Sequence, residues 1–239
     1  MATLRWNRIL FFVALAATTQ AQRVFELGEK VVYEDARKQQ TDLGAGFDPT
    51  PIADGEVVFV RGRRYGYGEE FDCTRPETKN WVAKYDPQTE KETKVFDHPI
   101  HYDGPGGLGF CAFAQMQMSY EGSVLYLLAS TYATSGNLAI VNLTSGSIAF
   151  VPGVIAVFVI ESGPHQNELI YQRRVYRKSP DDGLEYPSYP FIHGLADGRQ
   201  IREISNEYLT VGGNDKVPIL RKYLREIEGT ILANGQELP

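Results

Sequence analysis

The chain of 239 residues contains little cysteine and no long hydrophobic run. Its two cysteines, Cys73 and Cys111, lack the paired CxxC spacing of zinc sites, which argues against a metal held by thiolates. The apolar run from Ile9 to Ala16 is far shorter than the roughly 20 residues that a membrane-spanning helix needs. No later segment reaches that length without charge or glycine, so we expect no membrane span.

Several catalytic motifs are missing as well. The chain has neither a Gly-x-Ser-x-Gly elbow nor a Ser-x-x-Lys pair, the patterns that activate a serine hydroxyl in hydrolases. It has no helical HExxH zinc motif, and its glycine-rich stretch 104–109 lacks the Lys-Ser/Thr pair of a nucleotide-binding loop. These enzyme classes therefore have no support in the sequence, and we expect no cofactor.

The N-terminus has the three-part layout of a secretory signal peptide. Arg5 and Arg8 precede the apolar run, and small residues follow up to Ala21. We expect residues 1–21 to be removed on export to the periplasm or the extracellular space; an uncleaved interfacial helix is the alternative. Two of the 24 basic residues lie in this segment, which leaves 22 against 30 acidic residues, a net charge of −8. This acidity disfavours nucleic acid as a partner.

The cysteine pair fits an exported protein. Disulfides form and persist in oxidising compartments, so Cys73 and Cys111 are most simply one disulfide bond. A pair of buried free thiols, which behave as small apolar groups, is the alternative.

Short apolar segments bounded by glycine, proline, asparagine or aspartate fill most of residues 30–205, a pattern typical of antiparallel strands. The expected strands are Lys30–Glu34, Glu56–Arg61, Trp81–Asp86, Thr93–Asp97, Ala112–Met118, Val124–Ala129, Asn137–Leu143, Ser147–Val151, Val154–Glu161, Glu168–Val175, Pro190–Leu195 and Gln200–Ser205. Aligned by their turns, they form three divergent units whose first strands begin near residues 56, 123 and 168. Each unit ends in a turn, DPQTE, LTSG or LADG, followed by a last strand.

These units resemble the blades of β-propeller repeat proteins of the TolB and WD40-like group. The match is best in the second unit, where Leu138 to Gly146 follows the pattern L-x-x-x-[ND]-L-x-[ST]-G, and Asp54-Gly55 supplies the opening turn of the first. The resemblance covers about residues 50–205 and implies a small or incomplete propeller of antiparallel blades with about four strands each. A two-sheet β-sandwich is the alternative. We expect this β domain to span residues 22–213.

The hydrophobic period changes near the C-terminus. In residues 214–229, Leu220, Tyr223, Leu224 and Ile227 fall at i, i+3, i+4 and i+7, which predicts a helix with one apolar stripe. The expected helix and tail occupy residues 214–239. The helix either packs on the β domain or contacts a partner protein.

One loop gathers polar side chains that could hold a metal. His98, His101 and Asp103 lie within a few residues of one another, and imidazole and carboxylate groups are common metal ligands. A loop does not fix such residues on one face as a helix does, so a polar loop without metal is the alternative, and we predict no metal site.

Two aromatic loop segments are candidate binding surfaces, because tyrosine offers a large, stiff contact area with a polar tip. They contain Tyr65, Tyr67 and Phe71 in the first and Tyr186, Tyr189 and Phe191 in the second. The alternative is that these residues cover strand ends as a secondary core.

The sequence therefore favours an exported, non-catalytic binding or scaffold protein that uses loop surfaces on a β-propeller-like body. An immunity or inhibitor protein with a basic partner is one specific version, since the chain is acidic. The alternative is an envelope hydrolase or lyase with its site at the propeller mouth, around His98, His101 and Asp103.

Overall fold

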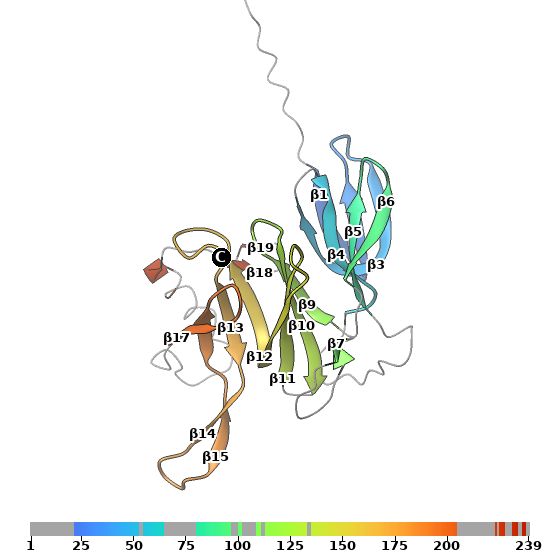
Figure 1. Cartoon of the computed structure of the whole chain (residues 1–239). Coiled ribbons are helices and arrows are strands. Elements are labelled where there is room, and N and C mark those ends of the chain that lie inside the picture. The colour runs from blue at the N-terminus through green and yellow to red at the C-terminus, as the bar shows by residue number, and fades with distance from the viewer. Residues whose placement is uncertain are drawn as a thin grey trace, which may run out of the picture.

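The structure, a computed structural model, describes residues 22–52, 55–64, 80–96, 100–101, 109–110, 113–132, 135–204, 223, 225–227, 231–233 and 236–237. Nearly all regular structure in these ranges is antiparallel β-sheet (Figure 1). The all-β prediction is therefore confirmed. Among the described residues, no helix is long and apolar enough to cross a membrane.

The first sheet has six strands that neighbour one another in chain order. They are β1 (Arg23–Leu27), β2 (Lys30–Glu34), β3 (Gln40–Pro51), β4 (Val57–Arg61), β5 (Trp81–Asp86) and β6 (Lys91–Phe96). Strand β3 belongs to two meanders, because its first half pairs with β2 and its second half pairs with β4.

The second sheet repeats this plan. Its main path is β9 (Phe113–Met118), β10 (Val124–Tyr132), β11 (Ser135–Asn142), β12 (Ile148–Ile160), β13 (Leu169–Arg173), β16 (Phe191–Gly194) and β17 (Gln200–Ile204). Strand β12 pairs with β11 through its first half and with β13 through its second half. Strand β18 (Ile231–Ala233) pairs with the second half of β12, and β19 (Gln236–Glu237) pairs with β18. Two further antiparallel pairs lie outside both sheets: β7–β8 (Ile100–His101, Gly109–Phe110) and β14–β15 (Val175–Lys178, Glu185–Ser188).

The two shared strands divide the protein into four successive meanders: β1–β3, β3–β6, β9–β12 and β12–β17. The last three contain the units predicted from the sequence, and each adds one strand, β3, β9 or β12, before the predicted first strand. The first is an additional unit of three strands that the sequence did not reveal. Among the described strands, no pairing closes the array into a ring.

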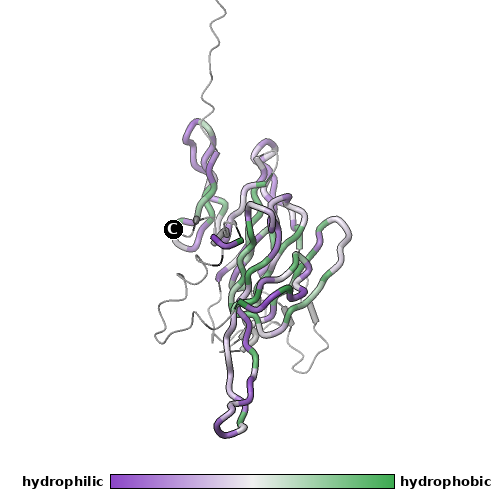
Figure 2. The backbone as a smooth tube through the Cα atoms, turned by 90° about the vertical axis from the view of Figure 1, so that its left-hand side faces the viewer, coloured by the Kyte–Doolittle hydropathy of each residue, from purple (hydrophilic) through white to green (hydrophobic). Residues whose placement is uncertain are grey.

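The hydrophobic core lies between neighbouring meanders, so that their central strands are buried on both faces. In β10, Leu125 and Leu127 belong to a cluster with the β3–β6 meander, whereas Tyr126 and Leu128 belong to a cluster with the β12–β17 meander. Figure 2 shows hydrophobic residues, in green, along many of these strands. Face-to-face packing of consecutive four-stranded meanders is how propeller blades are arranged. The resemblance to β-propellers is thus confirmed at the level of the fold.

Polar side chains join the first strands of successive meanders. A carboxylate oxygen of Asp48 in β3 accepts a hydrogen bond from the backbone N–H of Met116 in β9, at 2.6 Å. The amide oxygen of Gln117 in β9 accepts one from the backbone N–H of Val159 in β12, at 2.8 Å. These buried bonds give backbone N–H donors an acceptor from the neighbouring meander.

The C-terminal prediction needs correction. Of the predicted helix, the structure describes Tyr223, Arg225 and Glu226 as helical and Ile227 in a turn, so a helix of the expected length is not found in the described residues. The chain then adds strands β18 and β19, which the sequence analysis did not predict. Tyr223 is 3% exposed and packs on the outer face of the β12–β17 meander, so part of the apolar stripe covers that face.

Candidate functional site

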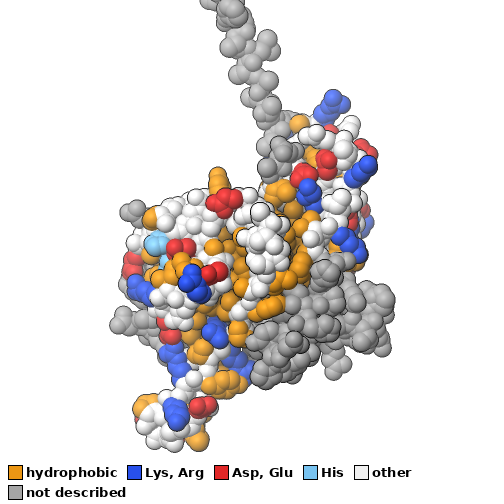
Figure 3. Space-filling view, in the orientation of Figure 1, with side chains coloured by type: hydrophobic (Ala, Val, Ile, Leu, Met, Phe, Trp, Pro, Cys, Tyr) orange, Lys and Arg blue, Asp and Glu red, His pale blue; other side chains and the backbone are white. Residues whose placement is uncertain are grey.

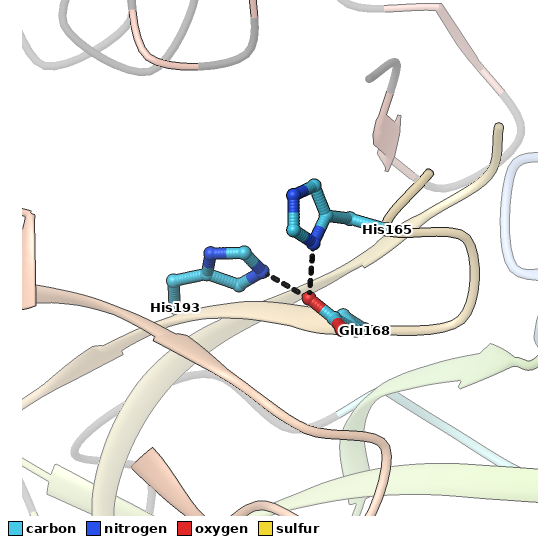
Figure 4. A group of neighbouring side chains, drawn as sticks. All are labelled: His165, Glu168 and His193. Carbon is cyan, nitrogen blue, oxygen red and sulfur yellow. Dashed lines mark hydrogen bonds and ion pairs between the residues drawn. The ribbon is translucent and has the colours of Figure 1, made fainter. Parts of the chain in front are cut away.

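Two histidines and a glutamate meet at one end of the β12–β17 meander (Figure 4). His165 lies in the turn between β12 and β13, Glu168 immediately precedes β13, and His193 lies in β16. The turn is held locally, since the backbone N–H of Glu168 donates to the carbonyl of His165 at 3.0 Å. Pairing of β13 with β16 then brings His193 beside Glu168, because His193 is opposite Ile170, whose side chain lies two residues from Glu168 on the same face.

Both imidazole rings contact the same carboxylate oxygen. Nδ1 of His165 lies 2.8 Å from Oε2 of Glu168, and Nε2 of His193 lies 2.6 Å from that oxygen. One ligand atom from each of the three residues falls within 4.8 Å of the others. On its other side, Nδ1 of His193 is hydrogen-bonded to the hydroxyl of Tyr223 at 2.9 Å. We call His165, Glu168 and His193 the histidine triad.

The triad runs from the interior to the surface. The His193 side chain is 3% exposed, that of Glu168 is 21% exposed and that of His165 is 37% exposed. Burial lowers the pKa of His193, and this outweighs the opposite effect of the neighbouring Glu168 carboxylate. His193 is therefore held as a neutral imidazole, which is the form that binds metal ions.

The contact between His193 and Glu168 is close but is not aligned as a hydrogen bond. The separation of 2.6 Å places the atoms at ion-pair distance, yet Nε2 of His193 has no hydrogen-bond partner of acceptable direction. A proton on Nδ1, donated to Tyr223, leaves a lone pair on Nε2 that points toward the triad.

Sequence analysis did not identify the triad. His165 and His193 are far apart in the chain, and their approach depends on strand pairing across the β14–β15 insertion. The His-x-x-Glu spacing of His165 and Glu168 was the one local signal. Of the predicted polar loop, His98 and Asp103 lie outside the described residues, and His101 is described only through its backbone in β7.

The predicted aromatic residues have different surroundings. Tyr186 lies on β15 and is 50% exposed, Tyr189 is partly buried, and Phe191 is 6% exposed within the core. Five other residues named from the sequence lie outside the described residues. They are the predicted contact residues Tyr65, Tyr67 and Phe71 and the predicted disulfide pair Cys73 and Cys111.

A second polar cluster lies beside a shallow pocket of about 200 Å³. The guanidinium of Arg64 donates to Glu26 of β1 and to Asp48 of β3, each at 2.8 Å. The backbone N–H of Asp48 also donates to the Glu26 carboxylate at 2.7 Å. Because these contacts link β1 and β3 to the segment after β4, the cluster is explained by its structural role.

No protein-family model and no curated protein matches this chain. Similar solved structures include the β-propeller domain of the Trilobed protease from Pyrococcus furiosus (11% identity, TM-score 0.45), TolB from Acinetobacter baumannii (13%, 0.44) and the acylaminoacyl peptidase of Pyrococcus horikoshii (10%, 0.44). The matches cover 74%, 75% and 74% of this chain and 49%, 38% and 28% of those chains, respectively. The chain therefore spans about half or less of their length.

Proposed function

We propose that the protein is an exported, non-catalytic binding protein that contacts a protein partner through the β14–β15 hairpin. The observation that carries the proposal is the exposure of three large apolar side chains on this hairpin. Tyr176 is 57% exposed, Leu184 is 60% exposed and Tyr186 is 50% exposed. The hairpin projects from the body of the protein at the lower end of Figure 1, and hydrophobic side chains lie on it in Figure 3.

The hairpin offers a contact residue on each face. Tyr176 pairs with Pro187 and Arg177 pairs with Tyr186 in the register, so the two tyrosines point to opposite faces of the ribbon. Leu184 lies in the turn that joins the strands. A ribbon with an aromatic group on both faces suits insertion into a groove of the partner, where both tyrosines lose contact with water.

Local bonds hold the hairpin in a defined conformation. The Tyr186 hydroxyl donates to the Asp182 carboxylate at 2.6 Å, and the backbone N–H of Leu184 donates to the same carboxylate at 2.9 Å. Arg177 donates to Glu203 of β17 at 2.5 Å, which ties the hairpin to the body. A contact surface that is already ordered loses little conformational entropy when it binds.

Export and acidity indicate the kind of partner. The signal-like segment 1–21 supports a periplasmic or extracellular protein, and the net charge of −8 of the remaining chain favours a basic partner through electrostatic steering. An immunity or inhibitor protein that blocks a basic enzyme in the same compartment fits both features. The segment with Tyr65, Tyr67 and Phe71 is proposed as a second contact region.

Affinity capture with the mature protein tests this proposal. Wild-type protein, the triple variant Y176S/L184S/Y186S and the control Y120S are each incubated with exported proteins of the source organism, and retained proteins are quantified by mass spectrometry. Tyr120 is 67% exposed but lies away from the hairpin in sequence, so it controls for the loss of an exposed tyrosine. We expect one partner to be retained by wild type and Y120S and to fall at least about tenfold with the triple variant, a loss typical of interface anchors. Equal retention by the triple variant would contradict the proposal.

A further inference from the structure

We infer that the histidine triad is a binding site for a divalent transition-metal ion, with Zn²⁺ as its best-suited occupant. The site is separate from the proposed partner surface, because none of its residues belongs to the β14–β15 hairpin. Two ring nitrogens and a carboxylate, drawn from a turn, a strand start and a neighbouring strand, converge on one point (Figure 4).

The convergence is not explained by hydrogen bonding alone. Nε2 of His193 is buried and faces the Glu168 carboxylate, yet it makes no aligned hydrogen bond. Native structures normally give a buried side-chain nitrogen of this kind a partner. A metal ion between the imidazoles and the carboxylate would use that lone pair.

Tyr223 orients the buried ligand as expected for a metal site. A metal-binding histidine usually donates its other ring N–H to a fixed acceptor, which sets the tautomer and the ring orientation. Here the hydroxyl of Tyr223 occupies that position at 2.9 Å from Nδ1 of His193. Tyr223 itself is held in the core, and the Arg202 guanidinium lies over its ring, 5.3 Å from the ring centroid.

The donor set selects the class of metal. Imidazole nitrogens favour zinc, copper, nickel and iron, whereas magnesium and calcium prefer oxygen ligands alone. Two histidines with one carboxylate supply three ligands for a four-coordinate zinc ion and leave one position for water or another group. The partly exposed side chains of His165 and Glu168 give the ion a route from solvent.

Calorimetric titration with Zn²⁺ tests the inference. The untagged mature protein is freed of metal with a chelator and titrated at pH 7.5, together with H165A, E168Q and the double variant H98A/H101A. The double variant is a matched control, because it removes the two histidines that lie outside the triad. Circular dichroism establishes that each variant is folded.

We expect wild type and H98A/H101A to bind one Zn²⁺ per chain with affinities within about twofold of each other. H165A and E168Q should each lose more than about 100-fold in affinity, since removal of a residue that only orients a ligand already costs about 10–100-fold. In a second measurement, Co²⁺ should give visible absorption bands with wild type that H165A lacks. Absence of stoichiometric zinc binding by folded wild type, unchanged binding by H165A and E168Q, or loss of binding in H98A/H101A would each overturn the inference.

Discussion

Asp48 illustrates, at the scale of single residues, how a buried charge is used to join two meanders. The residue is 3% exposed and has a positive φ of 50°, a conformation that aspartate and asparagine adopt more readily than most residues. Its carboxylate accepts hydrogen bonds from Arg64 and from the backbone of Met116. Burial raises the pKa of Asp48 more than the Arg64 guanidinium lowers it. The side chain therefore joins the two meanders through two acceptor oxygens, one facing Arg64 and one facing the Met116 N–H.

Two substitutions of Asp48 separate these contributions. D48N tolerates positive φ and keeps one acceptor oxygen for the Met116 N–H, but its NH2 group then faces the Arg64 guanidinium, so we expect a measurable loss in the free energy of unfolding. D48A leaves the buried N–H of Met116 without an acceptor and should cost about 1–3 kcal/mol more than D48N. Urea denaturation at pH 7 measures the difference. Equal stability of the two variants would show that the Asp48 oxygens contribute little.

The lowered pKa of His193 predicts that the free energy of unfolding depends on pH. Because burial lowers its pKa in the folded state, the unfolded chain takes up a proton near the ordinary value of about 6.5 while the folded protein does not. The contribution of neutral His193 to the free energy of unfolding is thus fully present above about pH 6.5 and is lost as the pH falls through the lower pKa of the folded state. A single titrating group such as His193 can change the free energy of unfolding by at most about 1.4 kcal/mol per pH unit.

We therefore expect the stability difference between the metal-free wild type and H193Q to shrink between pH 7.5 and pH 5.5. Guanidinium denaturation at several pH values measures it. A difference that is constant over this range would contradict the assignment of a neutral His193.

At the scale of elements, strands with clear alternation and flanking turns were predicted from the sequence. The bounds of β2 and β5 agree with the expected ranges Lys30–Glu34 and Trp81–Asp86. Strand β3 was missed because its sequence, QTDLGAGFDPTP, is rich in the residues that usually end strands, and pairing on two sides compensates for this. The predicted strands Ser147–Val151 and Val154–Glu161 are one strand, β12, since the chain continues through Pro152 and Gly153 instead of turning there.

The candidate site was less predictable than the strands for a related reason. Its local half, His165 and Glu168, lies within one turn, but His193 is brought to them only by the pairing of β13 with β16. The candidate ligands considered from the sequence were instead His98, His101 and Asp103, which lie close together in the chain, and no metal site was predicted there. Proximity in a chain is a poor guide to proximity in an antiparallel sheet, where partners are set by long-range register.

The repeated turns provide an element-scale prediction. Gly146 of LTSG and Gly198 of LADG both have positive φ, 70° and 82°. A Cβ on Gly146 would meet nothing within 4 Å, whereas one on Gly198 would lie 2.5 Å from a Val151 methyl group and 2.8 Å from a methyl of Ile140. G146A should therefore cost only the backbone strain of about 1–2 kcal/mol.

G198A should lower the free energy of unfolding by about 1–3 kcal/mol more than G146A does, because it also overpacks the core between two meanders. Urea denaturation of both variants gives the comparison. Equal losses would mean that the LADG turn moves away from the core at little cost.

At the scale of the whole molecule, stability comes from contact between successive meanders. The described residues form four buried clusters, three of them between neighbouring meanders and one between the β12–β17 meander and Tyr223 with Ile227. The sequence indicated the repeat because each unit has its own turn and apolar strands. It did not indicate the first meander, whereas the lack of ring closure among the described strands agrees with the incomplete form of propeller that the resemblance implied.

Mass spectrometry of protein secreted by an expression host tests the predicted processing. We expect the mature chain to begin at Gln22, because the small residues before it form the cleavage site. Alkylation should label neither Cys73 nor Cys111 before reduction and both cysteines after it. Retention of residues 1–21, or labelling without reduction, would contradict export or the disulfide, respectively.

Site-specific photo-crosslinking tests whether the β14–β15 hairpin contacts the proposed partner protein. A benzophenone amino acid replaces Tyr186 in one sample and Tyr120 in the other, and both are irradiated with exported proteins of the source organism. We predict a light-dependent adduct with a single protein from position 186 and none from position 120. No adduct from position 186, or the same adduct from both positions, would contradict the claim.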